Sequence, residues 1–297
     1  MRRTEAPAGC RPMHARTSAT RCPAASPNAL TGVASGSGRS AAPPATLPLR
    51  ARGEGARLRW ARSLTLLPWA VAGLTAQAAD TLQPFGAAGA APLAPWRVVA
   101  LPDQASPLTR FRVVELDGRR AVRIDAESSY GNLVHPLGYS ARTAALSWQW
   151  RLEQPMASAD LRTREGDDTA LKVCVMFDLP IGQVPFIERQ LLRLARAKTG
   201  EPLPAATLCY VWDAHLPAGT TLDNAYTRRM RYVVVRSGTR GLNEWVAEKR
   251  DVAADFARVF GDESKVLPPI IAVAIGADGD NTRARSLAYV AGPELSP

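Results

Sequence analysis

Several signatures of catalysis are missing from this 297-residue sequence. It contains no nucleophile elbow of the G-x-S-x-G type and no glycine-rich phosphate loop. Its three histidines and four cysteines form no cluster with the spacing of metal ligands. These absences exclude the enzymes and metal sites that a short motif identifies, and they assign no function by themselves.

A basic domain is missing as well, although the formal net charge is +10. Of the 37 Lys and Arg and the 27 Asp and Glu, residues 1–79 hold 11 arginines and two acids, which leaves 26 and 25 for residues 80–297. The positive charge therefore belongs to the N-terminal segment. A nearly neutral remainder does not suit a nucleic-acid partner, and we exclude one.

Residues 1–56 lack a periodic apolar pattern, so we expect them to be disordered or a mis-called N-terminal extension. A basic segment (57–62), an apolar stretch (64–74) and Ala76-Gln77-Ala78 follow. This order predicts a secretory signal peptide over residues 57–78 and a periplasmic or secreted protein. Because the apolar stretch is short and interrupted by Pro and Gly, we expect no stable transmembrane span after cleavage, with an uncleaved anchor as the alternative.

Residues 79–297 show many short alternating segments and only two helical patterns. An Asp117-Gly118 turn between two β-type runs predicts a hairpin, and the unbroken apolar run 270–276 predicts a strand inside a sheet. Leu146, Trp148, Trp150 and Leu152 alternate on one face, which favours core packing over a sugar-stacking platform. Because the spacings are too short for βαβ units, we predict a single mostly β domain, an antiparallel β-sandwich of jelly-roll type with two short peripheral helices.

The first helical pattern covers residues 186–198. Ile187, Leu191 and Leu194 recur at helical spacing, so we expect them to dock on the sheet. Arg193 belongs to an arginine stripe on the other side, which we interpret as a solvated face rather than a contact with acidic glycans or lipid headgroups.

Acidic residues flank two of the predicted core strands. Asp167 and Asp168 precede one strand, and Asp278, Asp280 and Asn281 follow another, so antiparallel neighbours would gather them at one rim of the sandwich. Like charges placed so closely need a neutralising group. We favour turn capping together with pairing to arginines, and the alternative is Ca²⁺ held by Asp278 and Asp280. The candidate arginines are Arg250, Arg283 and Arg285. The candidate binding residues are Asp167, Asp168, Asp278, Asp280, Asn281 and Arg250.

Cys174 and Cys209 are the two cysteines of residues 79–297. Each faces away from the apolar side of its predicted strand, so the two thiols are able to meet in a disulfide if the strands are neighbours. We favour two unpaired cysteines over that candidate disulfide.

Several motifs recur in a fixed order and spacing between about Trp96 and Gly292. They are Trp148-Gln149-Trp150, Asp167-Asp168, Phe177-Asp178, the segment 206–212, Arg250-Asp251-Val252, Phe260-Gly261 and Asp280-Asn281-Thr282. In this order and spacing they resemble the bacterial DUF3047 domain family. The resemblance implies an exported single domain and no particular activity.

Since no catalytic signature is present, we expect a non-catalytic binding module of the envelope, for a glycan or another envelope component. The alternative is a glycan-cleaving enzyme. A glycosidase would use two of the rim carboxylates, and a lyase would use His135, His215 or Tyr139 with Arg250. A structural subunit of an envelope assembly is a third hypothesis.

Overall fold

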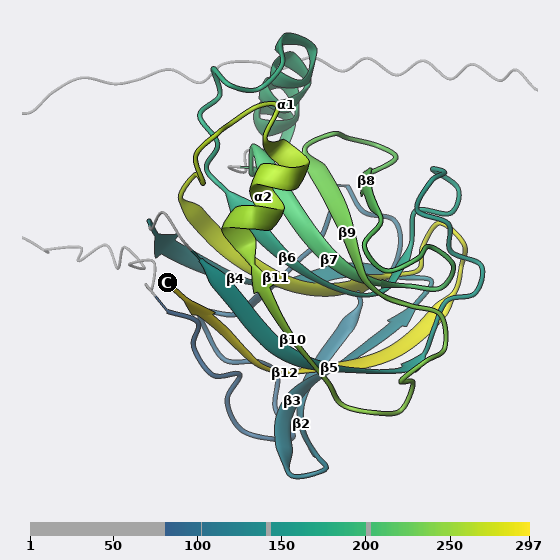
Figure 1. The fold of residues 1–297 in the computed structure, drawn as a ribbon. Helices are drawn as coiled ribbons and strands as arrows, with labels where there is room; N and C mark the ends of the chain where they lie inside the picture. The colour runs from purple at the N-terminus through teal and green to yellow at the C-terminus, as the bar shows by residue number, and fades with distance from the viewer. Residues whose placement is uncertain (1–80, 102, 141–143, 200–202) are drawn as a thin grey trace, which may run out of the picture. The chain divides into compact units, whose positions relative to one another are not determined.

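Two β-sheets lie face to face in the structure, a computed structural model that describes residues 81–101, 103–140, 144–199 and 203–297 (Figure 1). The extension expected at residues 1–56 and the signal peptide expected at residues 57–78 lie outside the described residues. Both assignments therefore stay predictions.

The larger sheet has seven strands, and the apolar run that begins at Ile270 lies inside it, as predicted. In spatial order the strands are β1 (Arg97–Val99), β4 (Tyr130–Tyr139), β11 (Ile270–Asp278), β6 (Thr169–Phe177), β7 (Ala206–Asp213), β9 (Met230–Ser237) and β8 (Thr221–Asp223).

The smaller sheet has five strands. In spatial order they are β10 (Val246–Asp251), β5 (Ala145–Gln154), β12 (Arg285–Ser296), β3 (Arg119–Glu127) and β2 (Arg110–Leu116). The hairpin of β2 and β3 turns at Asp117 and Gly118, whose φ angles of 51° and 71° are the positive values that a two-residue type I′ turn needs.

The strand order confirms the predicted jelly-roll sandwich. Eight strands give the order β3-β12-β5-β10 in one sheet and β4-β11-β6-β7 in the other. The chain changes sheet between β1 and β2, β3 and β4, β4 and β5, β5 and β6, β9 and β10, β10 and β11, and β11 and β12, and these crossings include the double Greek key of a jelly roll. One strand pair, β7 with β9, is parallel, because the segment 214–229 carries the chain back to the start of β7 before β9 begins.

Aromatic side chains fill the space between the sheets. The indoles of Trp148 and Trp150 on β5 are at most 2% exposed. Their ring centroids lie 5.4 Å from that of Tyr210 and 5.8 Å from that of Trp212, both on β7 of the opposite sheet. The Trp-x-Trp pair therefore belongs to the core, as the flanking leucines predict.

His135, a candidate base of the lyase alternative, lies in strand β4. His135 is fully buried in β4, where its Nε2 accepts the Gln83 N–H at 3.0 Å and its ring packs edge-on against Trp96. Pro136 pairs with Ala272 where the register between β4 and β11 shifts. Proline is tolerated at such an irregularity because no regular ladder hydrogen bond is needed there.

Cys174 and Cys209 form a disulfide, so the favoured interpretation of two unpaired thiols is wrong. The two residues lie directly opposite each other in the β6–β7 pair, with their Cα atoms 4.0 Å apart. The sequence separation is 35 residues, and closing a loop of that length stabilises the folded chain by roughly 4 kcal/mol on the chain-entropy model.

Helix α2 (Val252–Phe260) is the second of the two predicted short helices. The side chain of Asp251 accepts the Ala254 N–H at 2.9 Å and caps the helix, and Val252, Phe256 and Val259 are buried.

Helix α1 (Phe186–Thr199) has the expected extent but buries the opposite face. Leu192 is 5% exposed and belongs to the core, whereas Ile187, Leu191 and Leu194 are 72%, 56% and 67% exposed. The prediction that these three residues dock on the sheet is wrong.

No helix in the described part of the chain is long and apolar enough to cross a membrane.

Candidate functional site

One end of the sandwich, called the loop end below, gathers most of the acidic residues singled out in the sequence. It consists of the segments 155–168, 224–229 and 279–284, which precede β6, precede β9 and join β11 to β12. Because β6 and β11 are antiparallel neighbours with Asp278 opposite Thr169, the acids before β6 and at the end of β11 meet there. The predicted meeting of Asp167, Asp168 and Asp278 at one rim is what the structure shows.

Asp278 is neutralised by a lysine and not by an arginine. Its Oδ2 lies 2.7 Å from Nζ of Lys172, with side chains that are 8% and 2% exposed, and its Oδ1 accepts the Thr169 N–H at 2.8 Å and the Thr169 hydroxyl. Burial opposes the charge of Lys172, but the carboxylate of Asp278 together with Tyr130 and Asp167 outweighs it, so the pKa of Lys172 is raised. Two buried charges thus satisfy each other, and loss of either one would leave the other unpaired.

Asp168 fixes the loop between β11 and β12. Its two carboxylate oxygens accept the Asn281 N–H at 3.1 Å, the Thr282 N–H at 2.7 Å and the Thr282 hydroxyl at 2.5 Å. These are the short charge-assisted bonds of a carboxylate that caps a turn, which confirms the capping role for this residue. Burial raises the pKa of Asp168 even so.

Asp167 fixes the loop before β9. Its carboxylate accepts hydrogen bonds from the Asn224 amide at 2.5 Å and the Tyr232 hydroxyl at 3.2 Å, and it is 6% exposed. Burial, together with the nearby charge of Asp278, raises the pKa of Asp167 to about 6. Asp167 therefore titrates close to neutral pH, and no described cation forms a salt bridge with it.

The remaining candidates lie apart from this buried cluster. Asp280 is half-buried and accepts a 3.3 Å hydrogen bond from the Ser106 hydroxyl. Arg250 lies on β10 and forms a bidentate pair with Asp255 of α2, at 2.8 and 2.9 Å. Arg285 pairs with Glu127 at 3.6 Å. The proposed arginine pairing of the rim acids is therefore wrong, because Lys172 supplies the positive charge.

No group of three or more His, Cys, Asp and Glu side chains among the described residues is arranged to hold a metal ion. The oxygens of Asp278, which the Ca²⁺ alternative requires, are already occupied by Lys172 and Thr169. The cluster thus gives no support to the Ca²⁺ alternative.

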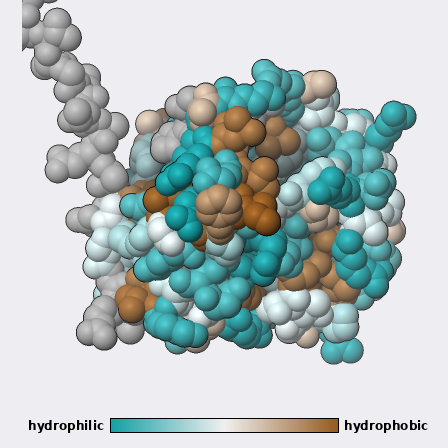
Figure 2. Space-filling view, turned by 90° about the horizontal axis from the view of Figure 1, so that it is seen from above, coloured by the Kyte–Doolittle hydropathy of each residue, from teal (hydrophilic) through white to brown (hydrophobic). Residues whose placement is uncertain are grey.

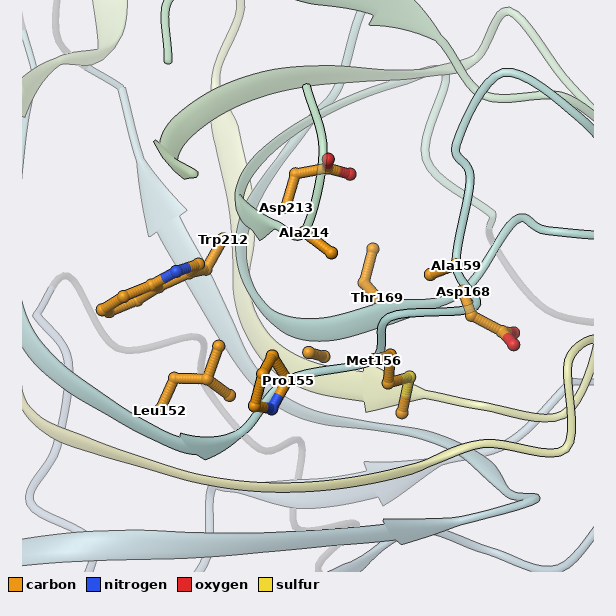
Figure 3. A pocket seen from close by; sticks show the side chains of 10 residues that line it. Leu152, Pro155, Met156, Ala159, Asp168, Thr169, Trp212, Asp213 and Ala214 are labelled. Atoms are coloured by element: carbon orange, nitrogen blue, oxygen red, sulfur yellow. The ribbon is translucent and has the colours of Figure 1, made fainter. Parts of the chain in front are cut away.

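The cavity nearest the cluster is too small for a sugar. Figure 3 shows it between the sheets, with Asp168 pointing away from it toward the loops. Its volume of about 10 Å³ matches a single water molecule. Its lining residues are Leu152, Pro155, Met156, Ala159, Asp168, Thr169, Ala170, Trp212, Asp213 and Ala214.

An aromatic side chain on the outside of the loop end is held by the same network. Tyr226 is 55% exposed, and its hydroxyl lies 3.0 Å from the Arg164 carbonyl oxygen and 3.2 Å from Oδ1 of Asn281. Its backbone N–H donates to Oδ1 of Asn224 at 3.0 Å, and the Arg164 guanidinium lies 5.4 Å from the ring centroid. Asn224 connects Tyr226 to Asp167, and Asn281 connects it to Asp168.

Sequence reasoning missed Lys172, Tyr226, Tyr232 and Asn224. A signal for Lys172 existed, because a single lysine inside the apolar strand that ends at Phe177 must find a buried partner. No comparable signal marked Tyr226 or Asn224, since loop residues show no periodicity.

A family profile described as protein of unknown function DUF3047 matches residues 94–293. The chain belongs to the DUF3047 family. The match covers the two sheets, both helices and the loop end of the DUF3047 domain, which confirms the resemblance seen in its motifs.

No curated protein matches this DUF3047 chain. Among solved structures, the chain is similar to TmCBM61 in complex with β-1,4-galactotriose, with 13% identity, a TM-score of 0.31, and coverage of 68% of this chain and 88% of that one. It is also similar to the xyloglucanase domain of NopAA, a type three effector from Sinorhizobium fredii, in complex with cellobiose, with 9% identity, a TM-score of 0.36, and coverage of 68% and 98%. Likenesses this distant carry no argument about function.

Proposed function

We propose that this DUF3047 protein is a non-catalytic glycan-binding module of the cell envelope that binds its ligand at the loop end. One observation carries the proposal: Tyr226 is an exposed aromatic ring that two buried carboxylates hold in place through Asn224 and Asn281. An immobilised ring loses little conformational entropy when a ligand stacks on it. The expected envelope location rests on the predicted signal peptide at residues 57–78.

Polar groups around the ring suit the hydroxyls of a sugar. The amide of Asn281 and the guanidinium of Arg164 lie beside Tyr226, and Asp280 lies next to Asn281 in the chain. Aromatic surface flanked by a few fixed polar groups is the usual composition of a small-ligand site. We assign Tyr226 the role of stacking platform, and Asn281, Arg164 and Asp280 the role of polar contacts.

The same geometry favours binding over cleavage. A glycosidase needs two carboxyl groups that face the scissile bond. Asp167, Asp168 and Asp278 are each at most 6% exposed, and all three are engaged in hydrogen bonds inside the protein. We therefore propose that these acids position the loops, while the residues above them contact the ligand.

The test is affinity electrophoresis of the full chain in gels that contain a soluble galactan, xyloglucan, β-glucan or lipopolysaccharide. Tyr226→Ala should weaken the retardation by about tenfold in Kd, whereas Tyr226→Phe, which keeps the ring, should retain most of it. Trp245→Ala is the matched control, because Trp245 is a half-buried aromatic that directly precedes β10 of the five-stranded sheet and lies under Arg119, whose guanidinium carbon is 5.5 Å from the ring centroid.

Two results would overturn the proposal. Loss of binding in Trp245→Ala with full binding in Tyr226→Ala would move the site to the five-stranded sheet. Release of reducing ends or unsaturated sugars from any of the four glycans would show an enzyme.

A further inference from the structure

The apolar face of α1 points to the outside of the molecule. Phe186, Ile187, Leu191 and Leu194 are 68%, 72%, 56% and 67% exposed. Figure 2, which looks down on the side of the molecule where α1 lies in Figure 1, shows apolar side chains gathered near the centre with polar ones around them. Exposed apolar surface concentrated on one element marks an interaction site more often than chance.

The helix cannot rotate to bury this face, because its inward side is fixed. Leu192 packs in the core, and Glu188 pairs with Arg229 at 3.4 Å. Near the other end of α1, Arg196 donates to the Leu203 carbonyl oxygen at 2.6 and 2.9 Å. The four apolar side chains are therefore presented outward by a helix anchored at both ends.

The charged side chains that α1 itself exposes are positive. Arg193 is exposed, and the Lys198 side chain is 72% exposed and forms only a 3.6 Å pair with Asp103, which is itself 82% exposed. Such solvated pairs hold little energy. Glu188 is the one acid of the helix, and it faces inward against Arg229.

We infer that α1 docks the protein on an anionic lipid surface. An amphipathic helix with Phe and Leu on one side and Arg and Lys at its margins lies in the plane of a bilayer interface, where the apolar side chains enter the acyl boundary and the cations meet anionic headgroups. A second copy of the chain suits the face less well, because a two-fold contact would bring Arg193 and Lys198 toward their own equivalents.

The inference is tested by sedimentation of the full chain with vesicles of equal parts phosphatidylcholine and phosphatidylglycerol, and with vesicles of phosphatidylcholine alone. The double variant Leu191→Gln/Leu194→Gln should lower the partition coefficient on anionic vesicles by about tenfold or more, and Arg193→Glu should lower it severalfold. Leu93→Gln is the matched control, since Leu93 is an exposed leucine (57%) outside α1. Residues 1–80 are common to all variants, so the differences report α1.

Tight binding of the wild type to anionic vesicles, weak binding to phosphatidylcholine, and loss of the anionic binding in the double variant would support the inference. Equal partition of wild type and double variant would overturn it, as would equal binding to the two kinds of vesicle. A wild-type dimer that the double variant converts to monomer, without vesicle binding, would overturn it in favour of self-association. None of these outcomes depends on whether Tyr226 binds a glycan.

Discussion

The loop end and helix α1 depart from the usual distribution of polarity in opposite directions. At the loop end, Lys172, Asp278 and Asp168 are charged side chains inside the protein, each with fixed partners. On α1, Ile187 and Leu191 are apolar side chains in solvent, and polar contacts on the inward side hold the helix. A buried charge is costly once it loses its partner, whereas an exposed leucine adds nearly nothing to stability. The loop end therefore contributes to stability, and the outer face of α1 is free to serve binding.

The strongest test of this contrast is Lys172→Ala. The substitution leaves Asp278 buried without a cation, so the free energy of unfolding should fall by about 3–5 kcal/mol. Urea denaturation measures the change, with Lys249→Ala on the exposed side of β10 as control. The double variant Lys172→Met/Asp278→Leu should recover much of the loss, and a loss below about 1 kcal/mol in the single variant would contradict a buried ion pair.

Adjacent leucines of α1 provide the next test. Leu192→Ala removes a core side chain and should cost about 2–4 kcal/mol, whereas Leu191→Ala should change stability by less than about 0.5 kcal/mol. Thermal or urea unfolding of the two variants compares them under identical helix propensity. Equal losses would mean that the helix does not bury the face that carries Leu192.

These leucines also show what the periodicity of a sequence does not predict. Periodicity correctly places Ile187, Leu191 and Leu194 on one face, and it correctly assigns Trp148 and Trp150 to the core. It does not say which way a face points, because that depends on partners distant in the sequence, such as Arg229 for Glu188. For this reason the buried face of α1 was predicted wrongly. The buried faces of strands with a single apolar side were predicted correctly.

The same limit applies to the loop end. Antiparallel pairing of two core strands was enough to predict that Asp167, Asp168 and Asp278 meet. The choice of Lys172 over an arginine follows from the register, which places Gly276 opposite Lys172 and brings its Nζ to Asp278. Register is set by the whole sheet and its irregularities, so residue-by-residue patterns do not reveal it.

A smaller effect is expected from the titration of Asp167. Its pKa in the folded protein, about 6, lies above the ordinary value of 3.8, so the group favours folding at low pH and this contribution is lost as pH rises through 6. The difference in unfolding free energy between Asp167→Asn and wild type should therefore shift in favour of the variant by about 2–3 kcal/mol between about pH 4 and about pH 7. A difference that does not vary with pH would mean that Asp167 stays ionised throughout.

The smallest expected losses of stability come from removing one hydrogen bond to a buried acid, Asp168, and one to a half-buried acid, Asp280. Thr282→Val removes the hydroxyl that bonds Asp168 and should cost about 1–2 kcal/mol. Ser106→Ala removes the 3.3 Å bond to Asp280 and should cost less than about 0.5 kcal/mol. Chemical denaturation measures both losses of stability. Equal losses would contradict the distinction between Asp168, which fixes a loop from inside the protein, and the half-buried Asp280.

The order of the strands has a consequence for the timing of folding. Strand β11 lies between β4 and β6 in one sheet, and β12 lies between β5 and β3 in the other, yet these two strands come last in the order of the described strands. Until residues 270–296 have been synthesised, β1 and β4 have no ladder to the rest of their sheet, and β2 and β3 have none to theirs. Neither sheet can therefore be completed before residues 270–296 have been synthesised, and until then the apolar residues of the strands on either side lack these neighbours.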